Sequence, residues 1–280
     1  MKQVKIGIVD SFFDRVEGKK DYATARLMGY ECVDYQDLCR TNGERYKGSD
    51  DDMKAILQKD REAAEAAGVE IWQVHGPWYV DDATEESRAF NLKCMKRCAL
   101  GTAMLGSKYM IVHPVMPYHW NKEDDPAWTY ELNMKYFAEV ADFAANIGVN
   151  VCLENMPVGH HSIGTLLQVA KFVREMNKDN FQICMDTGHA NITGEDIFAG
   201  MRLAGDKLTT LHIHDNRGHS DEHRFPFTGV FDWLQFRDIL KEIDYKGVYS
   251  LEPCMQDVTP VPVKYAYMTA AATATRSLAL

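Results

Sequence analysis

The sequence predicts a (β/α)8 TIM barrel, because one supersecondary unit repeats along the chain and metal-ligand residue types close successive predicted strands. In most units a helical pattern ends in glycine and a short apolar, β-branched run follows within a residue or two. Strands that alternate with helices pair in parallel through right-handed crossovers. Eight such units in about 250 residues are typical of a closed barrel.

Five of the eight predicted strands follow a glycine that ends a helix. Glycine takes the left-handed conformation there without the steric penalty of a Cβ, and a short loop leads into the strand. The glycines, in LMGYECVDY, AAGVEIWQVH, LGSKYMIVH, NIGVNVCLE and YKGVYSLE, are Gly29, Gly68, Gly106, Gly148 and Gly247. The other three strands are predicted in VKIGIVD from Val4, FQICMD from Phe181 and LTTLHIH from Leu208.

Helices are predicted between the strands from capping residues and hydrophobic period. They span 52–67, 86–105, 126–147, 165–176, 194–204 and 232–243, and the alanine- and threonine-rich stretch 263–280 is predicted as a final helix on the outside. Pro126 suits a first helical turn after Asp125, and Asp232 with Gln235 has the spacing of a capping box. A doubly wound open sheet is the alternative architecture, but no GxGxxG follows the first strand.

The composition is that of a globular protein that could form one large domain or two small ones, and we expect a single domain over residues 1–280. The chain is 46% hydrophobic and 26% charged, and it has no linker or low-complexity segment that would divide it. Its 31 basic and 41 acidic residues give a formal charge of -10, which disfavours nucleic acid as a partner. No apolar run approaches the roughly 18 residues that span a bilayer, and MKQVKIGIVD resembles a strand more than a signal peptide. We therefore expect a cytoplasmic protein without a membrane partner.

The cysteines are predicted to be reduced thiols. They number seven, an odd count, and form no CxxC pair. Cys94 and Cys98 are four residues apart on a predicted helix, but structural zinc needs four ligands. Small buried side chains explain them better.

Six consecutive predicted strands end in a metal-ligand residue type. These residues are His75 in VHGPW, His113 in IVHP, Glu154 in LENMP, Asp186 in MDTGHA, His212 in LHIHDN and Glu252 in LEP. In a barrel such strand ends converge on the face where active sites form. Any one of them could be a cap or ion pair, but the whole set would repel itself unless a cation or substrate organised it. His212 and His214, two residues apart, are predicted to point to the same side.

These motifs resemble the xylose-isomerase-like superfamily of barrels. LEN at Glu154, DTGH at Asp186 and His189, HIHD at His212, the run DEHRFPFTGVFDW and LEP at Glu252 carry the resemblance, which covers essentially the whole chain. The superfamily includes ketose epimerases, sugar isomerases, inosose dehydratases and endonuclease IV. The resemblance implies that Glu154, Asp186, His212 and Glu252 hold one divalent metal, usually Mn²⁺. Three carboxylates and an imidazole also suit Mg²⁺ or Co²⁺, with Zn²⁺ as a further alternative.

The activity that the resemblance implies is isomerisation or epimerisation of a sugar or sugar derivative through a metal-stabilised enediolate. Glu154 and Glu252 would act as base and acid on opposite faces of the substrate. His189 and Arg217 match positions that contact substrate oxygens in the superfamily. The segment NMPVGHH after Glu154 departs from the LNRFE-like run of ketose 3-epimerases, so the sequence leaves the substrate open.

An endonuclease IV-like zinc phosphodiesterase is the alternative function. His75, His113, Asp221 and His223 match the extra ligands that complete its three-zinc cluster, whereas sugar-handling members use such residues as substrate hydrogen-bonders. The acidic charge balance disfavours DNA. A metal-dependent dehydratase or lyase of the inosose dehydratase type is a second alternative. A sugar sensor or a subunit of a larger enzyme is a third, but binding alone would not require an acid and a base.

Aromatic residues after the strand ends are predicted to form an apolar wall for the sugar. Trp78 and Trp120 are the first candidates, because each follows a strand-end histidine. The other candidates are Tyr79, Tyr118 and Trp128, and His119, His160 and His161 either reach the site from loops or face solvent. The expected partner is a small-molecule sugar, and the oligomeric state stays open, a homo-oligomer included.

Overall fold

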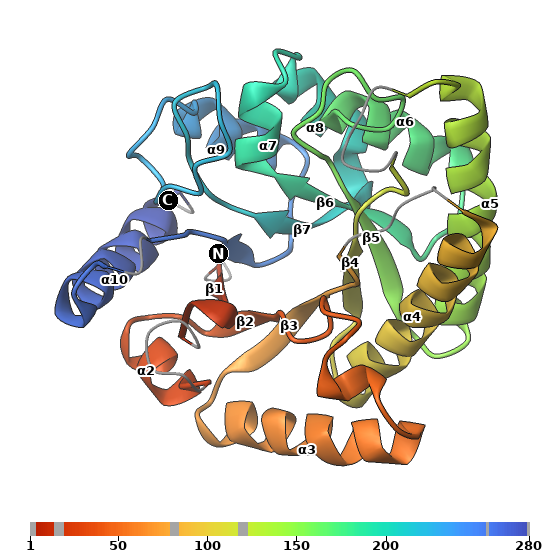
Figure 1. Cartoon of the computed structure of the whole chain (residues 1–280). Helices are drawn as coiled ribbons and strands as arrows, with labels where there is room; N and C mark the ends of the chain where they lie inside the picture. The colour runs from red at the N-terminus through yellow and green to blue at the C-terminus, as the bar shows by residue number, and fades with distance from the viewer. Residues whose placement is uncertain (1–3, 14–19, 79–83, 117–122, 256–257, 279–280) are drawn as a thin grey trace.

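The protein is described by a computed structural model that covers residues 4–13, 20–78, 84–116, 123–255 and 258–278. Eight parallel strands form a barrel with helices on its outside (Figure 1). The strands are β1 (Ile6–Val9), β2 (Cys32–Tyr35), β3 (Glu70–His75), β4 (Tyr109–Val112), β5 (Asn150–Glu154), β6 (Phe181–Asp186), β7 (Leu208–His212) and β8 (Tyr249–Leu251). The predicted fold class and all eight strands are confirmed.

The barrel closes between β7 and β8. Every other pair of neighbouring strands is joined by regular hydrogen bonding, in the order β7-β6-β5-β4-β3-β2-β1-β8. Between β7 and β8 there is only an isolated parallel bridge, from Ile213 to Leu251. The Ile213 N–H donates to the Ser250 carbonyl at 2.8 Å, and the Glu252 N–H donates to the Ile213 carbonyl at 3.0 Å. Two hydrogen bonds beyond the end of β7 therefore complete the ring.

The helices lie where the capping residues predict them. The long ones are α3 (Asp50–Ala66), α4 (Glu85–Met104), α5 (Pro126–Ala145), α6 (Leu166–Met176), α8 (Ile197–Ala204), α9 (Trp233–Glu242) and α10 (Val261–Ser277). Asp125 caps α5 ahead of Pro126, and Asp232 caps α9 by accepting from the Gln235 N–H at 3.0 Å. Helix α3 begins two residues before the predicted start, because Ser49 and Asp52 form a capping box.

Two short helices had no predicted range. They are α2 (Tyr22–Leu27), of which only the end at Gly29 was predicted, and α7 (Thr187–Ile192), each of six residues. Helix α7 continues directly from β6, and Asp186 caps it by accepting from the His189 N–H at 2.7 Å. A helix of fewer than two turns has too little hydrophobic period to be read from sequence.

Four of the five predicted glycine caps are confirmed, and one prediction is wrong. Gly29, Gly68, Gly106 and Gly148 have φ of 99°, 67°, 77° and 73°. Gly247 is not in the left-handed region, and Asp244, with φ 56°, takes that conformation after α9. Gly247 serves close packing instead, because a Cβ there would lie 2.5 Å from the Thr209 carbonyl oxygen.

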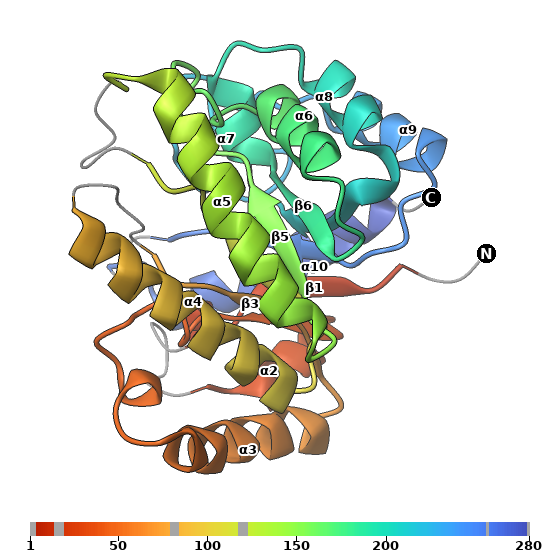
Figure 2. The ribbon, with the colours of Figure 1, turned by 90° about the vertical axis from the view of Figure 1, so that its right-hand side faces the viewer.

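The main hydrophobic core lies between the strands and the surrounding helices. Helices α3, α4 and α5 follow one another around the barrel, each in contact with the next (Figure 2). Helix α10 covers the start of the chain, where Tyr30 donates to the Met268 carbonyl at 2.9 Å. A small cluster of Ile111, Cys152 and Cys184 is separate from the main core.

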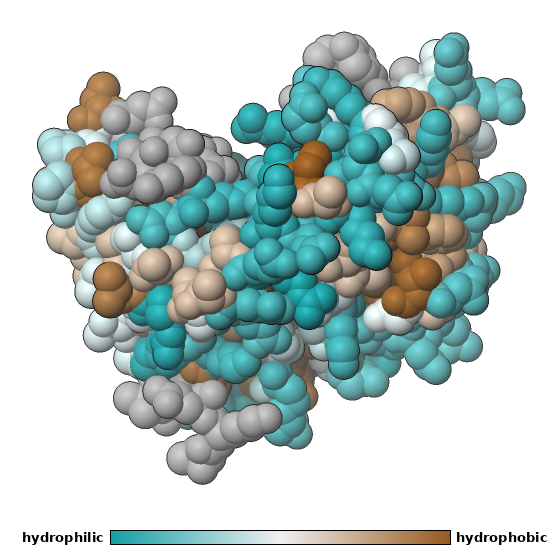
Figure 3. Space-filling model, turned by 90° about the horizontal axis from the view of Figure 1, so that it is seen from below, coloured by the Kyte–Doolittle hydropathy of each residue, from teal (hydrophilic) through white to brown (hydrophobic). Residues whose placement is uncertain are grey.

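All seven cysteines are free, as predicted. The face in Figure 3 is mainly hydrophilic, with its apolar side chains in separate small groups. Among the described residues, every helix is too short or too polar to cross a membrane.

Candidate metal centre and active site

The structure brings the four predicted metal ligands together at the carboxyl ends of the strands. Glu154, Asp186 and His212 are the last residues of β5, β6 and β7, and Glu252 follows β8. One ligand atom of each lies within 4.8 Å of the others. The Glu252 side chain is 18% exposed, whereas the other three are buried. Three carboxylates and one imidazole form a hard, oxygen-rich donor set that fits a divalent cation such as Mn²⁺ or Mg²⁺.

The ring of His212 is the centre of this set. Its Nδ1 lies 2.9 Å from Oε1 of Glu154 and 3.2 Å from Oε2 of Glu252. Burial lowers the pKa of His212, but the neighbouring Cys184, Glu154 and Glu252 raise it to well above its ordinary value. Burial raises the pKa of Glu154, but His212 and His113 outweigh it and hold that pKa well below the usual range. In the metal-free protein a proton on His212 thus partly balances the carboxylates.

Two strand-end histidines contact the same glutamate from the other side. Nε2 of His113 lies 3.1 Å from Oε2 of Glu154, and Nε2 of His75 lies 3.9 Å from the same oxygen. Burial lowers the pKa of His113, although Glu154 opposes the shift. The His75 ring stacks on His212, with centroids 5.6 Å apart and planes 6° apart.

A second cluster of imidazoles surrounds Asp221. Its Oδ2 lies 3.3 Å from Nε2 of His189 and 3.1 Å from Nε2 of His223. Burial lowers the pKa of both imidazoles, but carboxylates that include Asp221 raise each of them to about 10. The ring of His214 stacks on His223 at 3.9 Å and its Nε2 lies 2.9 Å from Asp186. At neutral pH both rings are therefore cationic, and their Nε2 atoms face Asp221 while their Nδ1 atoms face the Asn155 and Glu252 carbonyls.

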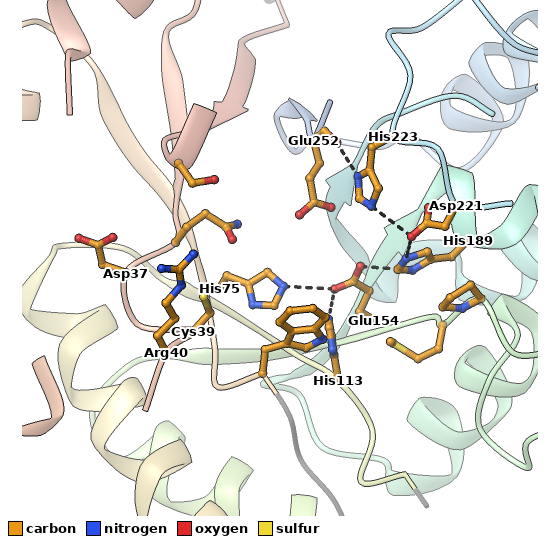
Figure 4. A pocket seen from close by; sticks show the side chains of 15 residues that line it. Asp37, Cys39, Arg40, His75, His113, Glu154, His189, Asp221, His223 and Glu252 are labelled. Carbon is orange, nitrogen blue, oxygen red and sulfur yellow. Dashed lines mark hydrogen bonds and ion pairs between the residues drawn. The ribbon is translucent and has the colours of Figure 1, made fainter. Parts of the chain in front are cut away.

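Both clusters open into one cavity of about 560 Å³. In Figure 4, Glu154 lies between His75 and His113 on one side and His189 and Asp221 on the other. The lining includes the predicted residues His75, His113, Glu154, His189, Asp221, His223, Glu252 and Trp78. Asp186 and His212 are fully buried and lie outside this lining.

The sequence reasoning missed one wall of the cavity. Its residues follow β1 and β2 and are Ser11, Gln36, Asp37, Cys39 and Arg40. The second strand ends in Tyr35, and Asp10, which closes the first, bonds to Lys20 and Tyr22 and does not line the cavity. Asp34 and Gln73, which are fully buried inside the barrel, were also not predicted as site residues. The available signal was a polar residue in the interior of each predicted strand, Asp34 in CVDY and Gln73 in EIWQVH.

Several other candidates do not line the cavity. The Arg217 side chain is 59% exposed and lies 3.6 Å from Glu222. Trp128 is on α5, where the Arg88 guanidinium lies 5.6 Å from its ring. His160 and His161 pack against each other, with centroids 4.6 Å apart. Trp120, with Tyr79, Tyr118 and His119, lies outside the described residues.

The sequence is similar to those of known sugar epimerases and isomerases. The chain is 27% identical over 143 residues to D-psicose 3-epimerase of Agrobacterium fabrum, covering 51% of this chain and 48% of the relative. It is 26% identical over 154 residues to inosose isomerase of Bacillus subtilis, covering 53% of this chain and 54% of the relative. The match thus spans about half the length of these curated relatives.

A solved structure shows the same fold over nearly the whole chain. The IOLI protein with a bound zinc atom has a TM-score of 0.79 at 18% identity, with 97% of this chain and 96% of that chain covered. The sequence also matches the family described as xylose isomerase-like TIM barrel over residues 22–274. The chain belongs to the xylose isomerase-like TIM-barrel family.

Proposed function

We propose that this chain is a divalent-metal-dependent isomerase or epimerase of sugars or sugar derivatives. The observation that carries the proposal is the placement of Glu154 and Glu252. They come from the ends of different strands and approach one ring nitrogen of His212, at 2.9 Å and 3.2 Å. Two carboxylates therefore flank one point at the edge of the cavity, as acid–base chemistry on two faces of a substrate requires.

The metal would be held by Glu154, Asp186, His212 and Glu252. Mn²⁺ suits this oxygen-rich set, and Mg²⁺, Co²⁺ or Zn²⁺ could replace it. A bound ion would polarise a substrate carbonyl and so acidify the neighbouring C–H.

The protein's own residues would carry out the proton transfers. One of the two glutamates would take the proton from the carbon next to the carbonyl, and the other would return a proton on the opposite face. Both line the cavity, so both can reach a bound substrate. Epimerisation follows when the two faces differ, and isomerisation follows when the proton returns to the adjacent carbon.

The remaining cavity residues would hold the sugar. The protonated rings of His189 and His223 hold Asp221 between them, and this carboxylate, which lines the cavity, is suited to accept a hydrogen bond from a substrate hydroxyl. Trp78, which is 48% exposed, offers an apolar face beside His113 at a ring distance of 6.5 Å. The partner is therefore a small-molecule sugar, and the relatives named as D-psicose 3-epimerase and inosose isomerase support this substrate class.

Solvent isotope exchange tests the proposal. The protein is incubated with Mn²⁺ in D₂O with a panel of ketoses and inososes, and the recovered sugars are analysed by NMR and mass spectrometry. Deuterium is expected at the carbon next to the carbonyl for at least one sugar, because a carboxylate can exchange its proton between abstraction and return. The Glu154→Gln and Glu252→Gln variants are the controls, and the one that lacks the proton-abstracting glutamate should incorporate little or no deuterium. Absence of deuterium from every sugar, with Mn²⁺ shown to be bound, would contradict the proposal.

A zinc phosphodiesterase is the second candidate function. It is favoured by two further ligand clusters, His75 with His113 and Glu154, and His189 with His214, Asp221 and His223. Within each cluster the ligand atoms lie within 4.8 Å of one another. DNA with an abasic site, tested beside the sugars, separates the two functions, since phosphodiester hydrolysis needs no C–H cleavage. Loss of water from an inosose in the same panel would identify a dehydratase.

A further inference from the structure

Strand β2 places a buried carboxylate against the side of His212 that faces away from Glu154 and Glu252. Oδ2 of Asp34 lies 2.7 Å from Nε2 of His212, and both side chains are fully buried. In the strand order, β1 and β8 separate β2 from β7. The contact therefore crosses the interior of the barrel and does not join neighbouring strands.

Gln73 on β3 holds this carboxylate in place. Its side-chain amide donates to Oδ2 of Asp34 at 3.0 Å and to the Leu211 carbonyl at 3.3 Å. Oδ2 of Asp34 thus accepts from both Gln73 and His212. Oδ1 of Asp34 has no hydrogen-bond partner in the part of the chain that the structure describes. Asp34 therefore uses one carboxylate oxygen to hold His212 and leaves the other oxygen without a hydrogen bond to any described residue.

This arrangement selects one nitrogen of His212 as the donor. Carboxylates face both ring nitrogens, Asp34 at Nε2 and Glu154 with Glu252 at Nδ1, and a carboxylate only accepts hydrogen bonds. If a cation takes the place of the Nδ1 proton, the proton that remains on the ring belongs on Nε2, where Asp34 accepts it. The neutral ring then turns its Nδ1 lone pair toward the point flanked by Glu154 and Glu252. A ring flip would put Cδ2 and Cε1 where Nδ1 and Nε2 now lie, so the contact with Glu154 and the contact with Asp34 would both be lost.

We propose that Asp34, anchored by Gln73, is a positioning residue that fixes the orientation and tautomer of His212 for metal binding. A carboxylate hydrogen-bonded to the distal nitrogen of a metal-bound imidazole orients the ring and increases its basicity. The inference rests on the proposed function, because it takes His212 as a metal ligand.

Metal affinity of the Asp34→Asn variant tests the inference. Mn²⁺ binding to the metal-free proteins is measured by isothermal titration calorimetry, and about a 10- to 100-fold loss of affinity is expected. Asp10→Asn is the matched control. Asp10 is also a fully buried aspartate, at the end of β1, but its described partners are Lys20, Tyr22 and the Gln36 N–H. This control makes the same charge change and should alter affinity less than about threefold.

A spectroscopic measurement separates positioning from a general loss of charge. In the Zn²⁺-loaded wild type, long-range ¹H–¹⁵N NMR is expected to show His212 with a protonated Nε2 and a zinc-shifted Nδ1. In Asp34→Asn the Nε2 proton should shift upfield or exchange faster, because its carboxylate acceptor is gone. Gln73→Leu, which removes only the anchor, should change the resonance in the same direction and weaken Mn²⁺ binding less than Asp34→Asn.

The outcomes distinguish this inference from the proposed function. Wild-type affinity and an unchanged His212 resonance in Asp34→Asn would overturn the positioning role while the metal centre stood. A wild-type protein that binds neither Mn²⁺ nor Zn²⁺ would overturn both. Should Asp34→Asn fail to fold by circular dichroism, Gln73→Leu decides: unchanged affinity and resonance there overturn the role of the pair.

Discussion

Gly188 lies directly against the ring of His214. A Cβ on Gly188 would come within 2.0 Å of Cε1 and 2.3 Å of Nδ1 of that ring. His214 in turn contacts the metal-set carboxylate of Asp186 at 2.9 Å. The glycine of the DTGH motif is therefore needed for close packing of an imidazole against α7.

The Gly188→Ala variant is expected to displace His214 and to disturb Asp186. Over-packing of this kind costs about 1–3 kcal/mol of unfolding free energy. Mn²⁺ affinity should fall by about tenfold, the equivalent of 1.4 kcal/mol at one ligand. Gly194→Ala is the control: with φ 73° and no atom within 4 Å of its Cβ, it strains the backbone without touching the site. Denaturant unfolding and calorimetry check both, and equal Mn²⁺ affinities in the two variants would contradict this explanation.

Replacing either candidate acid–base residue should abolish turnover without unfolding the barrel. Glu154→Gln and Glu252→Gln are each expected to lower kcat by about 10²–10⁴-fold, the range for loss of a general acid or base. Glu70→Gln is the matched control, since Glu70 starts β3 at the opposite end of the barrel and pairs with Lys5 there. Residues at that end carry stability and not chemistry. Near-normal rates in both site variants would refute the two-carboxylate mechanism.

The purified protein should carry about one divalent metal ion per chain. The proposed centre uses the four-residue set of Glu154, Asp186, His212 and Glu252. The imidazoles of His189 and His223, whose pKa values are raised to about 10, would have to lose protons before they could bind a second ion. Elemental analysis checks the stoichiometry, and three zinc ions per chain would favour the phosphodiesterase.

The Trp78→Ala variant is expected to weaken substrate binding more than it slows chemistry. Trp78 lines the cavity, so its loss should raise KM by roughly tenfold with a smaller change in kcat. Trp128→Ala is the control, because Trp128 has a similar exposure of 44% but lies on α5 beside Arg88. Steady-state kinetics on the substrate identified by isotope exchange makes the comparison. A rise in KM of equal size in both variants would argue against a sugar-binding wall at Trp78.

Asp10 is expected to make the protein less stable as the pH rises through 6. Burial raises the pKa of Asp10 to about 6, although Lys20 opposes the shift. The folded state thus favours the protonated form more than the unfolded chain does, whose pKa is near 3.9. The stabilisation is complete below about pH 4 and is lost above pH 6, a change of roughly 3 kcal/mol.

The Asp10→Asn variant isolates this contribution because asparagine does not ionise. Relative to wild type, its unfolding free energy should rise by about 2 kcal/mol between pH 4.5 and 7.5. Urea unfolding at both pH values measures the difference. A difference that did not change with pH would show that Asp10 does not titrate in this range.

The fold and much of the site could be predicted because each strand–helix repeat of the barrel has a recognisable local sequence pattern. Glycines such as Gly68 mark the end of a helix by a backbone requirement of their own. Strand-end residues such as Glu154 and His212 are recognisable because the topology carries every strand end to the same face.

The parts that could not be predicted depend on contacts between distant segments. Asp34 and His212 are 178 residues apart in the sequence, and no local pattern pairs them. Gly247 resembles a helix cap in the sequence. Its role is instead close packing against Thr209 on another strand, and no local pattern indicates that contact. Arg217 carried the right residue type near the right motif, but its side chain is exposed beside Glu222.

The connection between β7 and β8 has the fewest paired residues in the ring, and one proposed metal ligand lies on each side of it. Two backbone hydrogen bonds at Ile213 join these strands, while His212 precedes this connection and Glu252 follows β8. An ion bound by both residues would link β7 to β8, and its binding free energy would stabilise the closed barrel. Chelation should then loosen this connection before the rest of the fold, with faster amide hydrogen exchange at Ile213 and Glu252. Metal binding would therefore complete the closure of the barrel as well as prepare the site for its substrate.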